Sequence, residues 1–154
     1  MNTEQIERLI RRHVRDFDGV FSIDRLPSNP RLLVCNTDPS HRPGEHWVAM
    51  YVDGKGCHGE YFDSFGRPPP ETLRRYLNEH CMYWNFNDSQ SQSVASRFCG
   101  HYCVFYCILR SRDIDMRRIV SSFSRDTGFN DVLVALYVCN KSDEENVHVF
   151  LSFF

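Results

Sequence analysis

The start of the chain alternates apolar and charged residues at helical spacing. Asn2 can cap a helix there, with Gln5 three residues later as its capping-box partner. The apolar residues that follow share one helical face: Ile6, Leu9, Ile10 and Val14. This pattern predicts an amphipathic first helix that buries one side.

Short apolar runs between turn residues predict strands in the first half of the chain. Runs at 31–36 and 46–53 indicate buried strands, and the DGKG turn that follows returns the chain into a hairpin partner at 57–66. An aromatic run at 81–86 is also typical of a strand. We expect a loop over 17–30, because glycine, proline, serine and asparagine are concentrated there.

Helical patterns follow in the second half. A helix over 71–80 is expected to begin at Pro70, and further helices are expected at about 114–124 and 129–139. A long helix starting near Cys99 is apolar on almost every side, which predicts a central, buried position. The order of a helix, then strands, then helices predicts an α+β fold in a single domain spanning 1–154.

Composition narrows the class of protein. The 154 residues suffice for one packed core, and the net charge of −2 gives no overall field that would attract nucleic acid or a membrane. No apolar run approaches the roughly 20 residues of a membrane span. The charged N-terminal stretch lacks the apolar segment of a secretory signal, so we expect a protein of the nucleus or cytoplasm that is not secreted.

Three of the seven cysteines recur every fourth residue: Cys99, Cys103 and Cys107. They share a helix face, as metal ligands on one helix must, but zinc sites need a second close pair, and the sequence offers none. We therefore expect no metal, and Cys103 and Cys107 are expected to pack as small apolar residues. Cys99 differs, because it stands at a predicted helix start after a polar loop, where the helix dipole stabilises a reactive thiolate.

A thiolate nucleophile needs a base and a group that orients the base. Six of the seven histidines sit in charged or exposed contexts, whereas His46 opens an apolar strand. Glu60 and Asp63 lie three positions apart, so in one strand they would face opposite sides, and only one can meet His46. Asp63, at the end of its strand before a Ser-Phe-Gly turn, is the better candidate.

Three stretches together carry a family resemblance: NTDPSHRPGEHWVAMYV at 36–52, EYFDSFG at 60–66 and QSVASRFCGHYC at 92–103. They resemble the adenain family of adenovirus-type cysteine proteases, and most of all the adenain-like proteases of Polinton and adintovirus type. The same order of motifs occurs more distantly in SUMO- and NEDD8-deconjugating peptidases. The resemblance covers about residues 4 to 110, and the tail after 125 adds little to it.

The resemblance implies a papain-like core in permuted order, with a mixed central β-sheet and a central helix that carries the nucleophile. It makes His46 the general base, Asp63 its orienting acid and Cys99 the nucleophile. Gln92, seven residues before the cysteine, matches the glutamine whose amide helps to form the oxyanion hole. Gln90 lies in the same loop but two positions out of register.

The resemblance also implies a function. Such enzymes are endopeptidases that cut viral or element-encoded precursor proteins, such as capsid components, after glycine during maturation, and they can be packaged in virions. Trp47 matches a tryptophan that narrows the substrate cleft and so excludes side chains. One alternative is a peptidase that removes ubiquitin-like modifiers, and another is a binding module without activity.

Two accessory factors follow from the resemblance. Cys81, eleven residues before Gln92, matches the adenain cysteine that forms a disulfide with a short activating peptide, although a packed strand cysteine remains the alternative. Such a peptide could order the 87–98 loop. Adenain is also stimulated by DNA, but this chain is slightly acidic, so we expect weak DNA binding or none. No other cofactor is expected.

Overall fold

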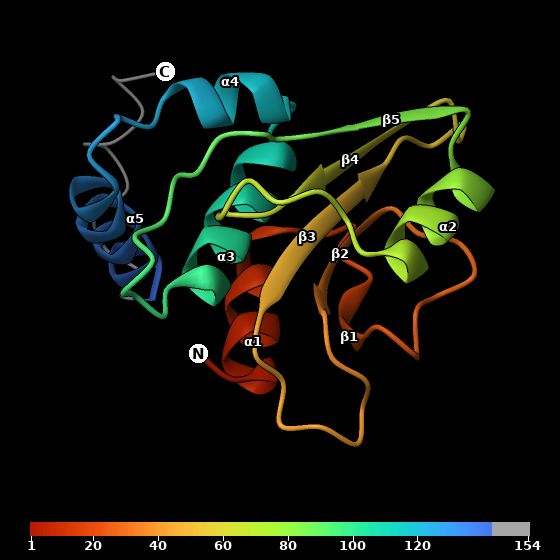
Figure 1. Ribbon diagram of the computed structural model, residues 1–154, viewed down its shortest axis with the longest axis horizontal. Coiled ribbons are helices and arrows are strands. Elements are labelled where there is room, and N and C mark those ends of the chain that lie inside the picture. The colour runs from red at the N-terminus through yellow and green to blue at the C-terminus, as the bar shows by residue number, and fades with distance from the viewer. Residues whose placement is uncertain (143–154) are drawn as a thin grey trace.

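The computed structural model describes residues 1–142, which are built around one five-stranded sheet (Figure 1). The strands follow chain order across it: β1 (Gly19–Ser22), β2 (Leu32–Asn36), β3 (Trp47–Val52), β4 (His58–Phe62) and β5 (Tyr83–Phe86). The two inner pairings are antiparallel, whereas β1 pairs with β2 and β4 with β5 in parallel. The mixed sheet of the predicted α+β fold is therefore confirmed.

One predicted loop contains a strand. The 17–30 segment, expected to be irregular throughout, begins with β1, which lies in parallel register with β2 from Gly19 opposite Leu33 to Ser22 opposite Asn36. Four residues are too few to show an alternation of apolar and polar side chains. The proline, serine and asparagine residues that follow also made the whole segment resemble a loop. Pairing with β2 supplies the backbone hydrogen bonds that make this edge segment a strand.

Five helices complete the described part of the chain: α1 (Thr3–His13), α2 (Glu71–His80), α3 (Cys99–Arg110), α4 (Met116–Ser121) and α5 (Thr127–Ser142). The predicted capping box of α1 is present, because Asn2 and Gln5 exchange two hydrogen bonds of 2.9 Å. Pro70 is the N-cap of α2, as its position before the helix predicted. No helix among the described residues combines the length and apolar character of a membrane span.

The sheet separates two apolar clusters. Alternate residues of β2 face opposite sides, so that Leu32 and Val34 pack with α1 and α3, whereas Leu33 and Cys35 pack with α2. The larger cluster surrounds α3, in which every residue from Tyr102 to Leu109 is buried. The prediction of a central buried helix is thus confirmed, and with it the packed positions of Cys103 and Cys107.

Candidate active site

Two strand ends and one helix start bring the predicted catalytic residues together. His46 immediately precedes β3, and Asp63 immediately follows β4, the antiparallel neighbour of β3. The start of β3 and the end of β4 lie side by side in the sheet, so the two side chains meet there, and His46 Nε2 is 2.8 Å from Asp63 Oδ1. Cys99 is the first residue of α3, and its thiol is hydrogen-bonded to the His46 imidazole.

Asp63 is held rigidly at this position. Its carboxylate, almost fully buried, also accepts a hydrogen bond of 2.8 Å from the Phe65 amide. The Asn87 side chain bonds both backbone groups of Asp63. Its Oδ1 accepts from the Asp63 N–H at 2.9 Å, and its Nδ2 donates to the Asp63 carbonyl at 2.6 Å. Sequence reasoning missed Asn87; its place directly after β5, the parallel neighbour of β4, was the available signal.

Glu60, the other acid considered, lies on the opposite side of β4 and does not reach His46. It is buried, accepts a hydrogen bond of 2.6 Å from the Tyr106 hydroxyl and forms an ion pair of 3.1 Å with Arg110. The strand alternation that separated the two acids in the sequence is therefore confirmed. Glu60 neutralises a cation of the core and is no part of the candidate site.

Opposing effects set the protonation of Cys99. Burial raises the pKa of the thiol, but a hydrogen bond from His46, backbone N–H groups of Trp47 and Gly100, and the charge of His46 together bring the pKa below its ordinary value. The position at the N-terminus of α3 acts in the same direction. A thiolate is therefore favoured here, in contrast to Cys107, whose pKa burial raises.

His46 shows the complementary shift. Burial lowers the pKa of the imidazole, but hydrogen bonds to Asp63 and Cys99 and the charges of both outweigh that effect and raise the pKa to about 9. An imidazole with a raised pKa beside a thiol with a lowered one describes a thiolate–imidazolium pair. The arrangement can thus supply a nucleophile and a proton donor at the same point.

Gln92 lies against this pair and its carboxamide is firmly oriented. The residue is fully buried; its Oε1 accepts from the Ser64 hydroxyl at 2.7 Å and its Nε2 donates to the Ser96 carbonyl at 3.0 Å. Because a carbonyl oxygen only accepts, the atom facing Ser96 must be the nitrogen. One of the two hydrogens on that nitrogen remains for another acceptor. Gln90 instead is exposed and bonds the Gln92 carbonyl.

The pair opens into a cleft of about 600 Å³ lined by His46, Trp47, Phe65, Gln92 and Cys99, among others. The Phe65 ring lies 5.1 Å from the His46 imidazole, and Trp47 is half-buried beside it. Five of the six residues singled out in the sequence therefore meet at one place: His46, Trp47, Asp63, Gln92 and Cys99.

Cys81, the sixth, lies elsewhere. It forms the C-cap of α2, is 9% exposed and packs in the smaller apolar cluster against Gly59 and Trp84. Burial raises the pKa of its thiol, which makes it a poor partner for disulfide exchange. The structure therefore gives Cys81 the packed position that was the alternative to a disulfide, and the activating-peptide disulfide stays a prediction. The 87–98 loop, which the peptide was expected to order, is bonded by the chain's own residues.

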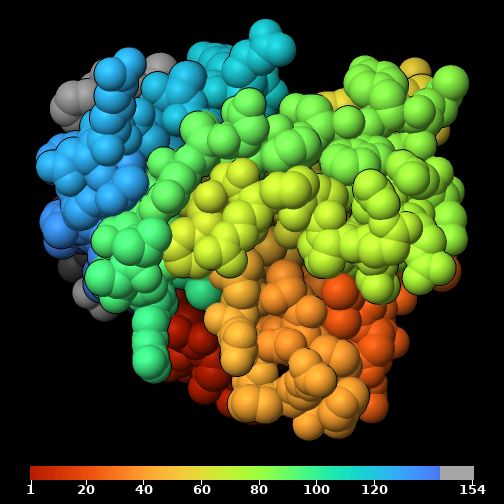
Figure 2. Space-filling model, viewed as in Figure 1, coloured from red at the N-terminus to blue at the C-terminus, as the bar shows by residue number. Residues whose placement is uncertain are grey.

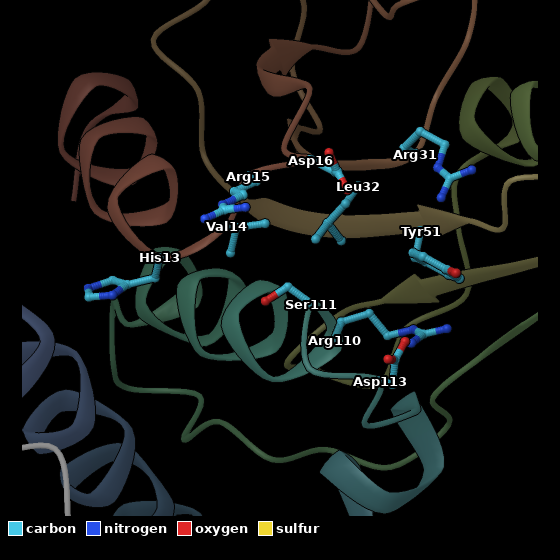
Figure 3. A pocket seen from close by; sticks show the side chains of 10 residues that line it. All are labelled: His13, Val14, Arg15, Asp16, Arg31, Leu32, Tyr51, Arg110, Ser111 and Asp113. Carbon is cyan, nitrogen blue, oxygen red and sulfur yellow. The ribbon is translucent and has the colours of Figure 1, made fainter.

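A second cavity, of about 400 Å³, lies at the other end of α3 (Figure 3). Its lining includes Arg110, which stacks 3.7 Å from the Tyr51 ring centroid and pairs with Glu60. None of the described residues that line it carries a thiol. Among the described residues there is also no cluster of histidine, cysteine and acidic side chains able to hold a metal. The cleft at Cys99 is thus the candidate active site.

Comparison with solved structures agrees with this fold. The pS273R protease of African swine fever virus superposes with a TM-score of 0.62 over 86% of this chain and 65% of that one, at 19% identity. The two share one fold. A selenomethionine structure of the same protease gives a TM-score of 0.50 and 26% identity over 68% of this chain and 43% of that one.

Sequence comparison leads to the same virus. The chain is 32% identical over 111 residues to a protein named cysteine protease in a tick isolate from Malawi, and equally to one named SUMO-1 cysteine protease in a warthog isolate from Namibia. Each match covers 62% of this chain, and the chain spans about two fifths of the length of these relatives (39%). No model of a known protein family matches the chain.

Proposed function

We propose that this chain is a cysteine protease with Cys99 as the nucleophile. The observation that carries the proposal is the continuous contact from Cys99 through His46 to Asp63, with Cys99 and His46 lining a cleft. The thiolate attacks the substrate carbonyl, and the His46 imidazolium donates its proton to the departing amine. Water then hydrolyses the thioester, with His46 acting as the base. Asp63 holds the imidazole in the orientation that both steps need.

We propose that the tetrahedral intermediate is stabilised by two donors. One is the N–H of Cys99 itself, which lies in the first turn of α3, where backbone amides have no partner within the helix. The other is the remaining N–H of the Gln92 carboxamide, which is already oriented by Ser64 and Ser96. Preorganised donors need no rearrangement as the oxyanion forms.

For the substrate, we propose precursor proteins encoded by a virus or mobile element, such as capsid components, cut after glycine during maturation. Two aromatic side chains, Trp47 and Phe65, flank the nucleophile, and a narrow aromatic cleft favours residues without side chains. The similarity to viral proteins named cysteine proteases supports the viral setting. Because the net charge is only −2, we propose that cleavage does not depend on DNA.

A second candidate is the removal of a ubiquitin-like modifier, supported by the name SUMO-1 cysteine protease of some relatives. The chemistry is the same, and only the substrate differs. A modifier would dock over the cleft as a folded domain, whereas a precursor would enter as an extended segment.

The test uses two electrophilic probes that end in glycine: a short peptide, and full-length SUMO-1. The chain is treated with each, and the adduct is located by mass spectrometry, with Cys99→Ala as the control. Labelling of Cys99 alone by the peptide supports the protease. Labelling by SUMO-1 at a far higher rate than by the peptide would favour deconjugation. Absence of any adduct at Cys99 would refute both and favour a binding module.

A further inference from the structure

The loop that carries Gln92 is held by two consecutive residues of α5. Asn130 Nδ2 donates to the Ser91 carbonyl at 3.1 Å, and Asp131 Oδ1 accepts from the Ser93 N–H at 3.4 Å. The peptide groups on either side of Gln92 are therefore both bonded to the C-terminal helix. Asn130 and Asp131 are 1% and 5% exposed, so water does not compete for these bonds.

Every polar group of the Asn130 side chain forms a hydrogen bond in this arrangement. Its second N–H donates to the Ser124 carbonyl at 2.9 Å, and its Oδ1 accepts from the Ser124 N–H at 2.9 Å. The side chain thus joins the turn before α5 to the loop before α3. Because all these polar groups are bonded and buried, the orientation of the Asn130 side chain is fixed. A shift of α5 would therefore move the Ser91 carbonyl with it.

A third side chain connects this pair to the helix of the nucleophile. Tyr102 lies on α3 one turn after Cys99, and its hydroxyl is 2.9 Å from Asp131 Oδ1 and 3.0 Å from the Ser91 carbonyl. The hydroxyl carries one proton and donates to one of these oxygens at a time. Tyr102 is fully buried, so α3, α5 and the loop meet in an environment without water.

The opposite side of the loop is bonded to the segment that follows β4 and carries Asp63. The Ser91 and Gln92 amides both donate to the Ser64 carbonyl, at 2.9 and 3.0 Å. Ser64 directly follows Asp63. The loop is therefore held between the segment after β4 and α5. Figure 2 shows the green 87–98 segment running between the yellow-green segment after β4 and the blue helices.

We propose that Asn130 and Asp131 are positioning residues that set the Gln92 carboxamide in the oxyanion hole. The inference rests on the proposed function. An oxyanion donor must lie within a few tenths of an ångström of its place, since a misplacement of about 1 Å can lower the rate about 10²-fold. The tail after residue 125, which adds little to the family resemblance, then contributes to turnover through α5.

The experiment is a double-mutant cycle between Asn130→Ala and Gln92→Ala, followed by cleavage of a glycine-containing peptide. Asn130→Ala is expected to lower kcat about 10- to 100-fold with KM nearly unchanged, because the oxyanion forms only after binding. In the Gln92→Ala background the same change is expected to lower kcat less than about twofold, since the donor it positions is gone. Alkylation of Cys99 by iodoacetamide, which forms no oxyanion, should proceed at the parent rate in all four proteins.

Val138→Ala is the matched control. Val138 is a buried residue of α5 that packs in the larger cluster, so its truncation destabilises the helix without touching the loop. It should lower the melting temperature and leave kcat unchanged at a temperature where the protein is folded. As a conservative rescue, Asp131→Asn keeps an acceptor oxygen and should retain most of the kcat that Asp131→Ala loses.

Two results would overturn the proposal. One is a loss of kcat with Asn130→Ala that is equally large in both backgrounds; the other is parent kcat accompanied by a lower melting temperature, as in the control. If Asn130→Ala does not fold, Tyr102→Phe replaces it in the cycle, because it removes only the hydroxyl. A parent chain that cleaves no peptide and leaves Cys99 unlabelled refutes the protease itself, which is a different outcome from additivity in an active enzyme.

Discussion

At the scale of single residues, the chemistry depends on which side chain holds the proton between Cys99 and His46. The pKa of the thiol is lowered and that of the imidazole is raised to about 9, and in each case contacts between the two outweigh the effect of burial. From the thiol's lowered pKa up to about pH 9, the ion pair is the dominant form.

The first prediction concerns this pair. His46→Ala should move the pKa of the Cys99 thiol up toward the free value of about 8.5, since the imidazolium no longer stabilises the thiolate. The measurement is the rate of iodoacetamide alkylation as a function of pH. Parent protein should reach its reaction plateau at a lower pH than the variant, because its thiol pKa is lowered. An identical profile for both proteins would show that another group stabilises the thiolate.

The second prediction is the pH dependence of cleavage. The rate should rise with pH as the thiol loses its proton and fall again near pH 9, where His46 loses the proton that it must donate to the leaving amine. Alkylation needs no proton donor and should not fall at the alkaline end. Measuring both profiles on one preparation separates the two groups. Cleavage that still increases above pH 10 would contradict the role of His46 as the acid.

The third prediction separates the roles of Glu60, in β4, and Asp63, directly after that strand. Asp63→Asn should lower kcat by roughly 10²- to 10⁴-fold, because an amide no longer holds His46 in the required tautomer. Glu60→Gln is the control: it breaks the buried pair with Arg110, so it should lower the free energy of unfolding and leave the pH profile of the folded protein unchanged. Steady-state kinetics and urea unfolding give both quantities. A larger loss of kcat with Glu60→Gln would reverse the assignment.

Among the helices and strands, the site is built from the ends of two strands and the start of one helix. His46 and Asp63 lie at adjacent ends of two antiparallel strands, and Cys99 begins a helix that packs on the same sheet. Side chains at such ends lie at the border of the packed core and have a rigid backbone behind them. The Gln92 loop is the exception, since hydrogen bonds from Ser64 and from α5 replace regular structure there.

The fourth prediction belongs to that loop. Gln92→Ala should lower kcat about 10²- to 10³-fold with little change in KM, as expected for the loss of one oxyanion donor. Gln90→Ala should have a much smaller effect, because Gln90 is exposed and its side chain bonds only the Gln92 carbonyl. Both variants are compared by kcat and KM on one peptide. The opposite ranking would place the oxyanion hole two residues earlier.

In the molecule as a whole, the two apolar clusters on opposite faces of the sheet support different elements. The larger one surrounds α3 and supports the nucleophile, whereas the smaller one packs under α2, and its Cys81 does not line the cleft. Cys81 belongs to the smaller cluster. Its substitution should therefore change stability and leave chemistry alone.

The fifth prediction follows from that division. Cys81→Ser should lower the free energy of unfolding by about 1–3 kcal/mol, because a hydroxyl would be buried among apolar neighbours. Peptide cleavage by the folded protein should match the parent, with or without a cysteine-containing peptide under mild oxidation. Urea unfolding and the cleavage rate test the two parts. A disulfide between Cys81 and such a peptide, accompanied by higher activity, would support the activation hypothesis.

The elements themselves followed from local pattern. The capped first helix, the α2 start after Pro70 and the apolar α3 were all predicted, because each depends on residues close together in the chain. The four-residue β1 was missed, because an edge strand of that length is defined by its partner, β2, and not by its own alternation.

The sequence alone also indicated Cys99 as the nucleophile and favoured Asp63 over Glu60, because strand alternation and the end of a strand can be recognised locally. The folded chain was needed to show the 2.8 Å contact of Asp63 with His46, the burial of Cys81 and the bonds from Asn130 and Asp131 of α5 to the Gln92 loop. Those contacts join residues that are 17 to 39 positions apart. The spacing of residues along the chain does not predict such contacts, because they form only when the helices pack on the sheet.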